Sequence, residues 1–229
     1  FHPLEAKEPE LVTAGLDLKL RSELGFALGQ LGQYDLAAKE LEKCLARDRD
    51  HYMAASGLAY TLYNSLFAAK NKEILLTPEA KRQRIHKAHE LFRKAQELRP
   101  DQVTNYYRQG MLYKSIQNKP DAALPLFAKA VENWRSLSED EKKSRHRERK
   151  NFIKSLYNLA WCQTRQGQPK AAQTCIQECI QKDQETGYIS MEHKYFALGK
   201  VCFQLGHNKE SLQALEMAAR FTNPKDGNF

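Results

Sequence analysis

One spacing recurs five times along the chain and constrains its fold more than any other feature. A small residue is followed four positions later by a larger residue and three positions after that by a second small residue. The five occurrences are Ala37/Leu41/Cys44, Ala88/Phe92/Ala95, Ala123/Phe127/Ala130, Ala172/Ile176/Cys179 and Ser211/Leu215/Ala218. Steps of four and three place all three residues on one face of a helix. The recurrence predicts similar helical repeats stacked along the chain, an arrangement that creates an extended binding surface.

Each triplet is preceded by a second helical pattern that contains a small residue. Gly25 and Ala59 hold this position in the first two repeats and lie 34 residues apart. Helix-breaking glycines such as Gly32 and Gly206 fall between the two patterns of a repeat. Each repeat is therefore predicted to be a hairpin of two antiparallel helices.

The pattern resembles that of the tetratricopeptide repeat family, W-x2-L-G-x2-Y followed by A-x3-F-x2-A and a proline. Pro100 and Pro224 stand where second helices should end. The resemblance implies an all-α fold, a right-handed superhelical array (α-solenoid) of about five hairpins. A lead-in at 1–17 is expected to extend the first helix, and residues 226–229 form a tail. The array spans 18–225, with repeats at 18–51, 52–102, 103–137, 153–186 and 192–225.

Two insertions interrupt the regular spacing. The second repeat holds about 17 extra residues, so extended helices are predicted over 66–83, with Thr77 as the cap of the second one. In the segment 138–152, Ser138 and Glu141 have the spacing of a capping box. The fourth repeat is therefore predicted to open with one long helix that runs from about Ser138 to Gln166.

Composition limits the kinds of partner and compartment. The 229-residue chain has a net charge of +8, which favours acidic partners, although it lacks an uninterrupted block of Lys and Arg. Its five cysteines are odd in number and form no CxxC pair, which indicates a reducing compartment and predicts a cytoplasmic location. The sequence contains no apolar run of membrane-spanning length, so a membrane is not expected as a partner.

Catalytic and metal-binding motifs are absent from the sequence. It contains no nucleophile elbow, P-loop, HExxH motif or glycine-rich phosphate cradle, so we expect neither enzymatic activity nor a cofactor. Cys175 and Cys179 are four residues apart on a predicted helix, with Cys162, Cys202 and His193 as further candidate zinc ligands. Cysteines at small core positions are better explained by packing. No metal site is predicted.

In the family that the chain resembles, the first helix of each repeat lines a concave face. Matching positions here carry aromatic, amide and basic side chains that we expect to be free of packing. Aromatic and Arg residues are typical of binding hot spots, and Asn can hold the main chain of an extended peptide. The predicted partner-binding residues are Tyr60, Tyr63, Asn64, Tyr107, Arg108, Met111, Lys114, Tyr157, Asn158, Trp161, Arg165, Phe196 and Lys200.

One ligand known for this family is not expected. Some members bind the C-terminal carboxylate of a chaperone through a clamp of Lys, Asn, Asn, Lys and Arg. The matching positions of the first three repeats are Ser22, Phe26, Gly57, Thr104 and Arg108. Only Arg108 fits, so the chaperone-tail clamp is predicted to be absent.

The predicted function is that of a protein–protein interaction scaffold or adaptor. Its aromatic- and basic-lined concave groove would bind a peptide or partner helix with some acidic character, and the end faces of the array are candidates for self-association. One alternative is an RNA-binding helical array, which would stack its aromatic rings on bases. It would use the cations Arg108, Lys114, Arg165 and Lys200 together with the basic segment Lys142–Lys150. Another is a regulatory interaction module of a larger signalling protein.

Overall fold

The computed structural model describes residues 14–222, and its regular secondary structure in this range is entirely helical. The all-α prediction is confirmed. The chain divides into two compact parts, here called the N-terminal block (Phe1–Pro100) and the C-terminal block (Asp101–Phe229). The predicted tail at 226–229 and most of the predicted lead-in lie outside the described residues.

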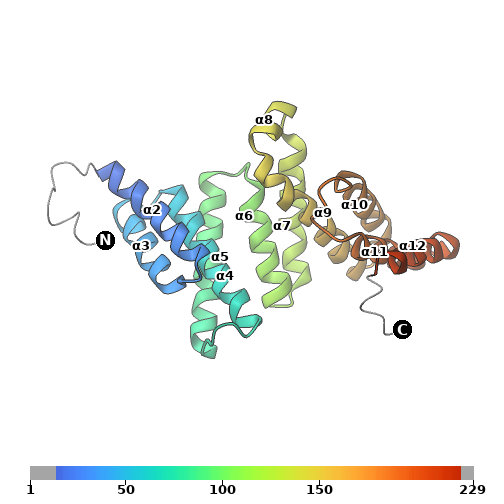
Figure 1. Cartoon of the computed structure of the whole chain (residues 1–229), viewed down its shortest axis with the longest axis horizontal. Coiled ribbons are helices and arrows are strands. Elements are labelled where there is room, and N and C mark those ends of the chain that lie inside the picture. Colours follow the sequence, from blue (N-terminus) through green and yellow to red (C-terminus); the bar gives the residue numbers. More distant parts are fainter. Residues whose placement is uncertain (1–13, 223–229) are drawn as a thin grey trace. The chain divides into compact units, whose positions relative to one another are not determined.

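The N-terminal block contains two helix hairpins (Figure 1). Its helices are α2 (Ala14–Gln30), α3 (Tyr34–Arg47), α4 (Tyr52–Lys70) and α5 (Pro78–Leu98). Helix α2 pairs with α3, α4 pairs with α5, and α3 also packs against α4. The predicted triplet Ala37, Leu41 and Cys44 is fully buried. A β-carbon at Gly25 would come within 2.5 Å of Leu41 Cγ, so the close approach of α2 to α3 requires a glycine there.

The C-terminal block contains three more hairpins (Figure 1). Its elements are α6 (Val103–Met111), the π-helix η1 (Leu112–Ile116), α7 (Pro120–Ser136), α8 (Glu139–Ser144), α9 (His146–Arg165), α10 (Pro169–Lys182), α11 (Met191–Gln204) and α12 (Asn208–Phe221). Helix α6 pairs with α7, α9 with α10, and α11 with α12. Phe127 and Ile176, the central residues of two triplets, are fully buried in one apolar core.

The insertion in the second repeat lengthens its hairpin. Helices α4 and α5 have 19 and 21 residues, against 17 and 14 in α2 and α3. The α5 cap forms as predicted, because Thr77 Oγ1 accepts a hydrogen bond of 3.1 Å from the Ala80 N–H. No helix within residues 14–222 combines the length and apolar character needed to cross a membrane.

The long helix predicted from Ser138 to Gln166 is wrong in one respect. The capping box at Ser138 and Glu141 is present, but the helix it begins ends at Ser144. Arg145 leaves the helical conformation, and its guanidinium donates hydrogen bonds of 2.6 and 2.9 Å to Asp101 and of 2.9 Å to Glu148. These contacts anchor the break, after which α9 begins at His146.

Candidate partner-binding site

The inner face of the C-terminal block, defined here by the leading helices α6, α9 and α11, gathers cations around an indole ring. Lys114 Nζ lies 4.4 Å from the centroid of the Trp161 ring and 6.0 Å from that of Tyr157. Arg165 Cζ lies 5.0 Å from the Trp161 centroid. These separations fall within the range of cation–π attraction. We call Lys114, Tyr157, Asn158, Trp161 and Arg165 the Trp161 cluster.

A change of helical geometry positions Lys114. Helix α6 ends at Met111 and continues as the π-helix η1, which carries Lys114 in its middle. Lys114 Nζ donates a hydrogen bond to Asn158 Oδ1 on α9. Single-turn π-helices are rare and occur often at functional sites, because they redirect side chains relative to the regular helix.

Asn158 does not have the exposure expected of a residue that holds a ligand main chain. It is buried, its Oδ1 accepts from Lys114, and its Nδ2 donates to the Lys154 carbonyl oxygen at 2.6 Å. Its predicted direct role is therefore corrected, since both ends of the amide are engaged within the protein. Asn158 instead fixes the position of Lys114 over the Trp161 ring.

Positive charge accumulates along this face. Lys154 is half-buried, and burial together with nearby Lys150 lowers the pKa of its ammonium group. Neither Arg165 nor Lys200 forms an ion pair with a carboxylate of residues 14–222. Lys200 Nζ lies 5.5 Å from the centroid of Phe196, an exposed ring on α11. The face thus presents cations beside aromatic rings, a combination that attracts anionic groups.

The N-terminal block presents aromatic rings without this charge. Phe26 on α2 and Tyr60, Tyr63 and Phe67 on α4 form a continuous row, which we call the aromatic ladder. Successive ring centroids are 6.1, 6.2 and 4.5 Å apart. Helix α4 carries no charged residue before Lys70 at its end. Predicted residues Tyr60, Tyr63 and Asn64 are all partly exposed.

Comparisons with known proteins identify the type of repeat and the fold. Sequence models of the tetratricopeptide repeat match residues 18–51 and 154–186, in the first and fourth predicted repeats. A structure of MamA protein is 15% identical with a TM-score of 0.66, covering 93% of this chain and 95% of that one. Residues 18–51 and 154–186 are tetratricopeptide repeats, and the chain shares the fold of the MamA structure.

A second solved structure has the same fold. YrrB, described as a tetratricopeptide repeat protein with an unusual peptide-binding site, is 16% identical. The match covers 96% of this chain and 91% of YrrB, with a TM-score of 0.64. No curated protein sequence is significantly similar to the chain. Likeness at this level of identity concerns the fold, so the binding surface has to be argued from the residues of this chain.

Tyr107 is not exposed on the inner face, where the sequence placed it. It is 8% exposed, belongs to the core, and lies 6.2 Å from Phe127 between ring centroids. Gly110 explains the placement, because the absence of a side chain lets the Phe127 ring approach α6 closely. Met111 also packs against this core, whereas Arg108 is partly exposed. The prediction that Tyr107 is exposed on the inner face is therefore wrong.

A buried ion pair between Asp183, which follows the last residue of α10, and Lys194 of α11 was not predicted from the sequence. Lys194 Nζ donates to Asp183 Oδ2 at 2.9 Å, and both side chains are fully buried. The Asp183 carboxylate also accepts from the N–H groups of Tyr188 and Ile189 and from Thr186 Oγ1. Burial acts to raise the pKa of Asp183, but these hydrogen bonds, led by that from Ile189, hold the pKa below its ordinary value. A Lys at a core position of α11 was the signal available.

The cysteines serve as core residues of the repeats. All five are buried and unpaired. Burial raises the pKa of the Cys162 thiol to about 11 and that of the Cys179 thiol to about 12, so neither is a reactive thiolate at neutral pH. Within residues 14–222, no group of three or more His, Cys, Asp or Glu side chains is arranged to hold a metal ion.

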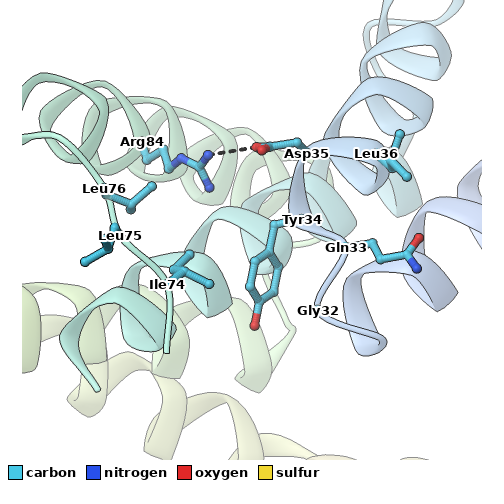
Figure 2. A pocket seen from close by; sticks show the side chains of 9 residues that line it. All are labelled: Gly32, Gln33, Tyr34, Asp35, Leu36, Ile74, Leu75, Leu76 and Arg84. Carbon is cyan, nitrogen blue, oxygen red and sulfur yellow. Dashed lines mark hydrogen bonds and ion pairs between the residues drawn. The ribbon is translucent and has the colours of Figure 1, made fainter. Parts of the chain in front are cut away.

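The insertion of the second repeat builds a hollow that the sequence did not reveal. Figure 2 shows residues 74–76 of the α4–α5 loop facing the start of α3. The hollow has a volume of about 340 Å³ and is bounded by the Arg84–Asp35 ion pair at 2.7 Å. Leu75 beside it is 96% exposed. This small apolar surface belongs to the N-terminal block and is separate from the aromatic ladder residues.

Proposed function

We propose that this protein is an interaction scaffold that binds an acidic peptide or partner helix on the inner face of its C-terminal block. Tetratricopeptide repeat proteins are typically non-enzymatic interaction modules. The observation that carries the proposal is the Trp161 cluster, in which Lys114 and Arg165 both lie over one indole ring. YrrB, whose description names a peptide-binding site, is a precedent for ligand binding on the same fold.

Each part of the face has a distinct chemical role in the proposal. Arg165 has a planar guanidinium that can bind a carboxylate through two parallel hydrogen bonds. Lys114 is already oriented by Asn158, which reduces the entropy lost when a ligand binds. Phe196 and Phe203 on α11 are exposed and offer contacts to apolar side chains of the ligand. The ligand is therefore a segment that combines Asp or Glu with aliphatic or aromatic residues.

The aromatic ladder gives the N-terminal block a different preference. Three of its four rings lie on α4, which has no charge before Lys70, and Phe26 on α2 is exposed. We assign it to apolar or aromatic side chains of a partner, with little dependence on salt. The ladder and the Trp161 cluster are treated as independent sites, each tested by its own substitutions.

The RNA-binding alternative is less well supported by the charges of the basic segment. Lys142, Lys143 and Arg145 each form an ion pair with a nearby carboxylate. These acids would repel a phosphate backbone. Titration with a short single-stranded RNA at two salt concentrations tests for RNA binding, because the affinity for RNA falls steeply as the salt concentration rises. RNA affinity that falls steeply with salt would favour this alternative, and no detectable RNA binding at low salt would remove it.

A reducing compartment such as the cytoplasm is the proposed location. Five buried, unpaired cysteines are consistent with it. The third reading, a regulatory module within a larger signalling protein, uses the same surfaces to hold a neighbouring domain. Localisation of the full-length protein in cells tests the first point, and its domain composition tests the second.

Selection from a displayed library of random peptides tests the proposed function. We expect enriched sequences to contain Asp or Glu next to aliphatic or aromatic residues. The double variant Lys114→Met/Arg165→Met should lose this enrichment. The matched control is Lys170→Met/Lys182→Met, which removes two exposed cations of α10 and should select the same peptides as the wild type. Enrichment without acidic residues, or equal results for both double variants, would contradict the proposal.

A further inference from the structure

The repeats share one type of joint between neighbouring hairpins. In the N-terminal block the leading helix α4 packs on the trailing helix α3, and in the C-terminal block α11 packs on α10. Equivalent positions in the leading helices follow from the small residue of each repeat. These reference residues are Gly25 in α2, Ala59 in α4, Ala160 in α9 and Gly199 in α11. Counting from these reference residues, each position of α2 can be compared with the equivalent position of α4, α9 or α11.

Helix α2 exposes positions that the other leading helices bury. Leu20 is 49% exposed, whereas the equivalent residues Ala54 of α4 and Lys194 of α11 are fully buried. Ala27 is exposed, whereas the equivalent Thr61 is buried. The interior residues are covered by a preceding trailing helix. The described residues supply no such helix for α2, whose uncovered face carries Leu20 and Ala27 with the exposed Glu23 between them.

Helix α12, the last trailing helix of the described residues, is also more exposed than the equivalent helices α3 and α10. Leu215 of α12 is 37% exposed, whereas the equivalent residues Leu41 of α3 and Ile176 of α10 are fully buried. Leu212, one helical turn away, is 60% exposed. In the interior hairpins the following leading helix contributes to this burial. Helix α12 therefore carries the trailing half of a joint, and α2 carries the leading half.

We infer that α2 of one copy packs on α12 of a second copy, in the manner of α11 on α10. A second copy is the occupant because it carries both halves of the joint, an uncovered leading face on α2 and an uncovered trailing face on α12, in the register of the interior joints. The joint is heterologous, since two different surfaces meet. Each copy keeps one unused half, so further copies can add in the same direction. The inference is independent of peptide binding at Trp161.

The interior joint also indicates which residues meet. Gln173 of α10 donates a hydrogen bond to Cys202 of α11, with 3.7 Å between Nε2 and Sγ. The equivalent positions at the ends are Leu212 in α12 and Leu28 in α2. Leu212→Cys in one copy should therefore form a disulfide with Leu28→Cys in another. Leu75→Cys, in the exposed α4–α5 loop, is the control for random collision.

Sedimentation over a series of concentrations tests the inference with Leu20→Glu and Leu212→Glu. The wild type should show a sedimentation coefficient that rises with concentration. Each variant alone should remain monomeric, because every α2 half or every α12 half is blocked. An equimolar mixture should form dimers and nothing larger, since one intact half from each variant can meet. Trp161→Ala should assemble like the wild type.

Two results would overturn the inference. One is a wild type that stays monomeric at every concentration, which leaves these faces to another part of the chain or to an unlike protein. The other is assembly by either variant alone, which indicates a joint between identical faces. Both leucines are substantially exposed, so folding should be retained. If circular dichroism shows otherwise, Leu20→Gln and Leu212→Gln replace the glutamate variants.

Discussion

The two blocks are built from the same repeat but present different chemistry on their inner faces. Leu41 in the N-terminal block and Ile176 in the C-terminal block occupy equivalent core positions, and both are fully buried. The inner positions of α2 and α4 carry a ladder of rings, whereas those of η1 and α9 carry cations over Trp161. The packing positions of a repeat are constrained by the hairpin, whereas the inner positions differ between the blocks and, in the proposed function, serve to bind partners. Substitutions at packing positions and at inner positions should therefore have different effects.

The largest expected effect concerns the fully buried ion pair of the C-terminal block, Lys194 with Asp183. Asp183→Asn leaves Lys194 buried without its charged partner, which should lower the free energy of unfolding by about 3–5 kcal/mol. Hydrogen exchange should show lost protection in α10 and α11 and unchanged protection in α3 and α4. Asp183→Leu/Lys194→Met, which removes both charges, should recover part of the loss. Equal loss of protection in both blocks would contradict the assignment of the ion pair to the stability of the C-terminal block.

The same carboxylate predicts a pH dependence. The pKa of Asp183 is lower in the folded protein than its ordinary value near 3.9. Its contribution to stability is therefore complete above about pH 4 and declines as the pH falls through the lower folded-state value. Hydrogen exchange of α10 and α11 from pH 5 to pH 2 should follow this decline. Asp183→Asn should lack this component, and an unchanged profile in the variant would refute the assignment.

Glycine substitutions compare the packing of the two blocks directly. A β-carbon at Gly110 would come within 2.7 Å of Phe127 Cε1, much as one at Gly25 would approach Leu41. Gly25→Ala and Gly110→Ala should each cost about 1–3 kcal/mol of unfolding free energy, measured by denaturation. Gly15→Ala is the control, because nothing lies within 4 Å of that β-carbon and alanine favours the helix. A neutral Gly110→Ala would show that α6 and α7 are packed loosely.

The inner faces should differ in how they lose affinity. Trp161→Ala should weaken binding of the selected acidic peptide about tenfold or more, a typical loss for a hot-spot aromatic residue. Tyr60→Ala should leave that affinity nearly unchanged. The binding constants, measured by calorimetry at two salt concentrations, should fall with salt for the wild type and less so for Lys114→Met. Equal effects of the two alanine variants would remove the distinction between the faces.

The smallest effect is expected at the hollow of the N-terminal block. Leu75 is almost fully exposed beside it. Leu75→Ser should change the free energy of unfolding by less than about 0.5 kcal/mol, because little apolar surface is returned to water. It should also leave acidic peptide binding at Trp161 unaffected. A larger loss of stability would mean that the α4–α5 loop supports the hairpin and is more than a surface feature.

The fold could be predicted from sequence because it depends on spacing. The triplet containing Leu41 and its equivalents specifies which face of each trailing helix is buried, and that information is local and periodic. The break at Arg145 could not be predicted, because it depends on Asp101, a residue far away in the sequence. The buried pair of Lys194 and Asp183 has the same origin in a tertiary contact.

The sequence predicted which residue types gather at the candidate site, but it did not predict the contacts that their side chains make. Helical phase correctly brought Lys114, Trp161 and Arg165 toward one face. It placed Tyr107 there as well, because phase alone does not reveal that Gly110 draws Phe127 and its neighbours into the core. It also treated Asn158 as a ligand contact, although a π-helix directs Lys114 onto its side chain. These differences arise from packing between helices and not from the periodicity within them.

Fluorescence of Trp161 provides the most direct test of acidic-ligand binding by the C-terminal block. The chain has two tryptophans, and Trp134 is buried against Phe152, so Trp134→Phe leaves Trp161 as the single indole reporter. Titration with the selected peptide should change its emission in a saturable way. The same peptide with Gln and Asn in place of Glu and Asp should have no effect at equal concentrations. An equal response to both peptides, or no response to the acidic one, would contradict the account.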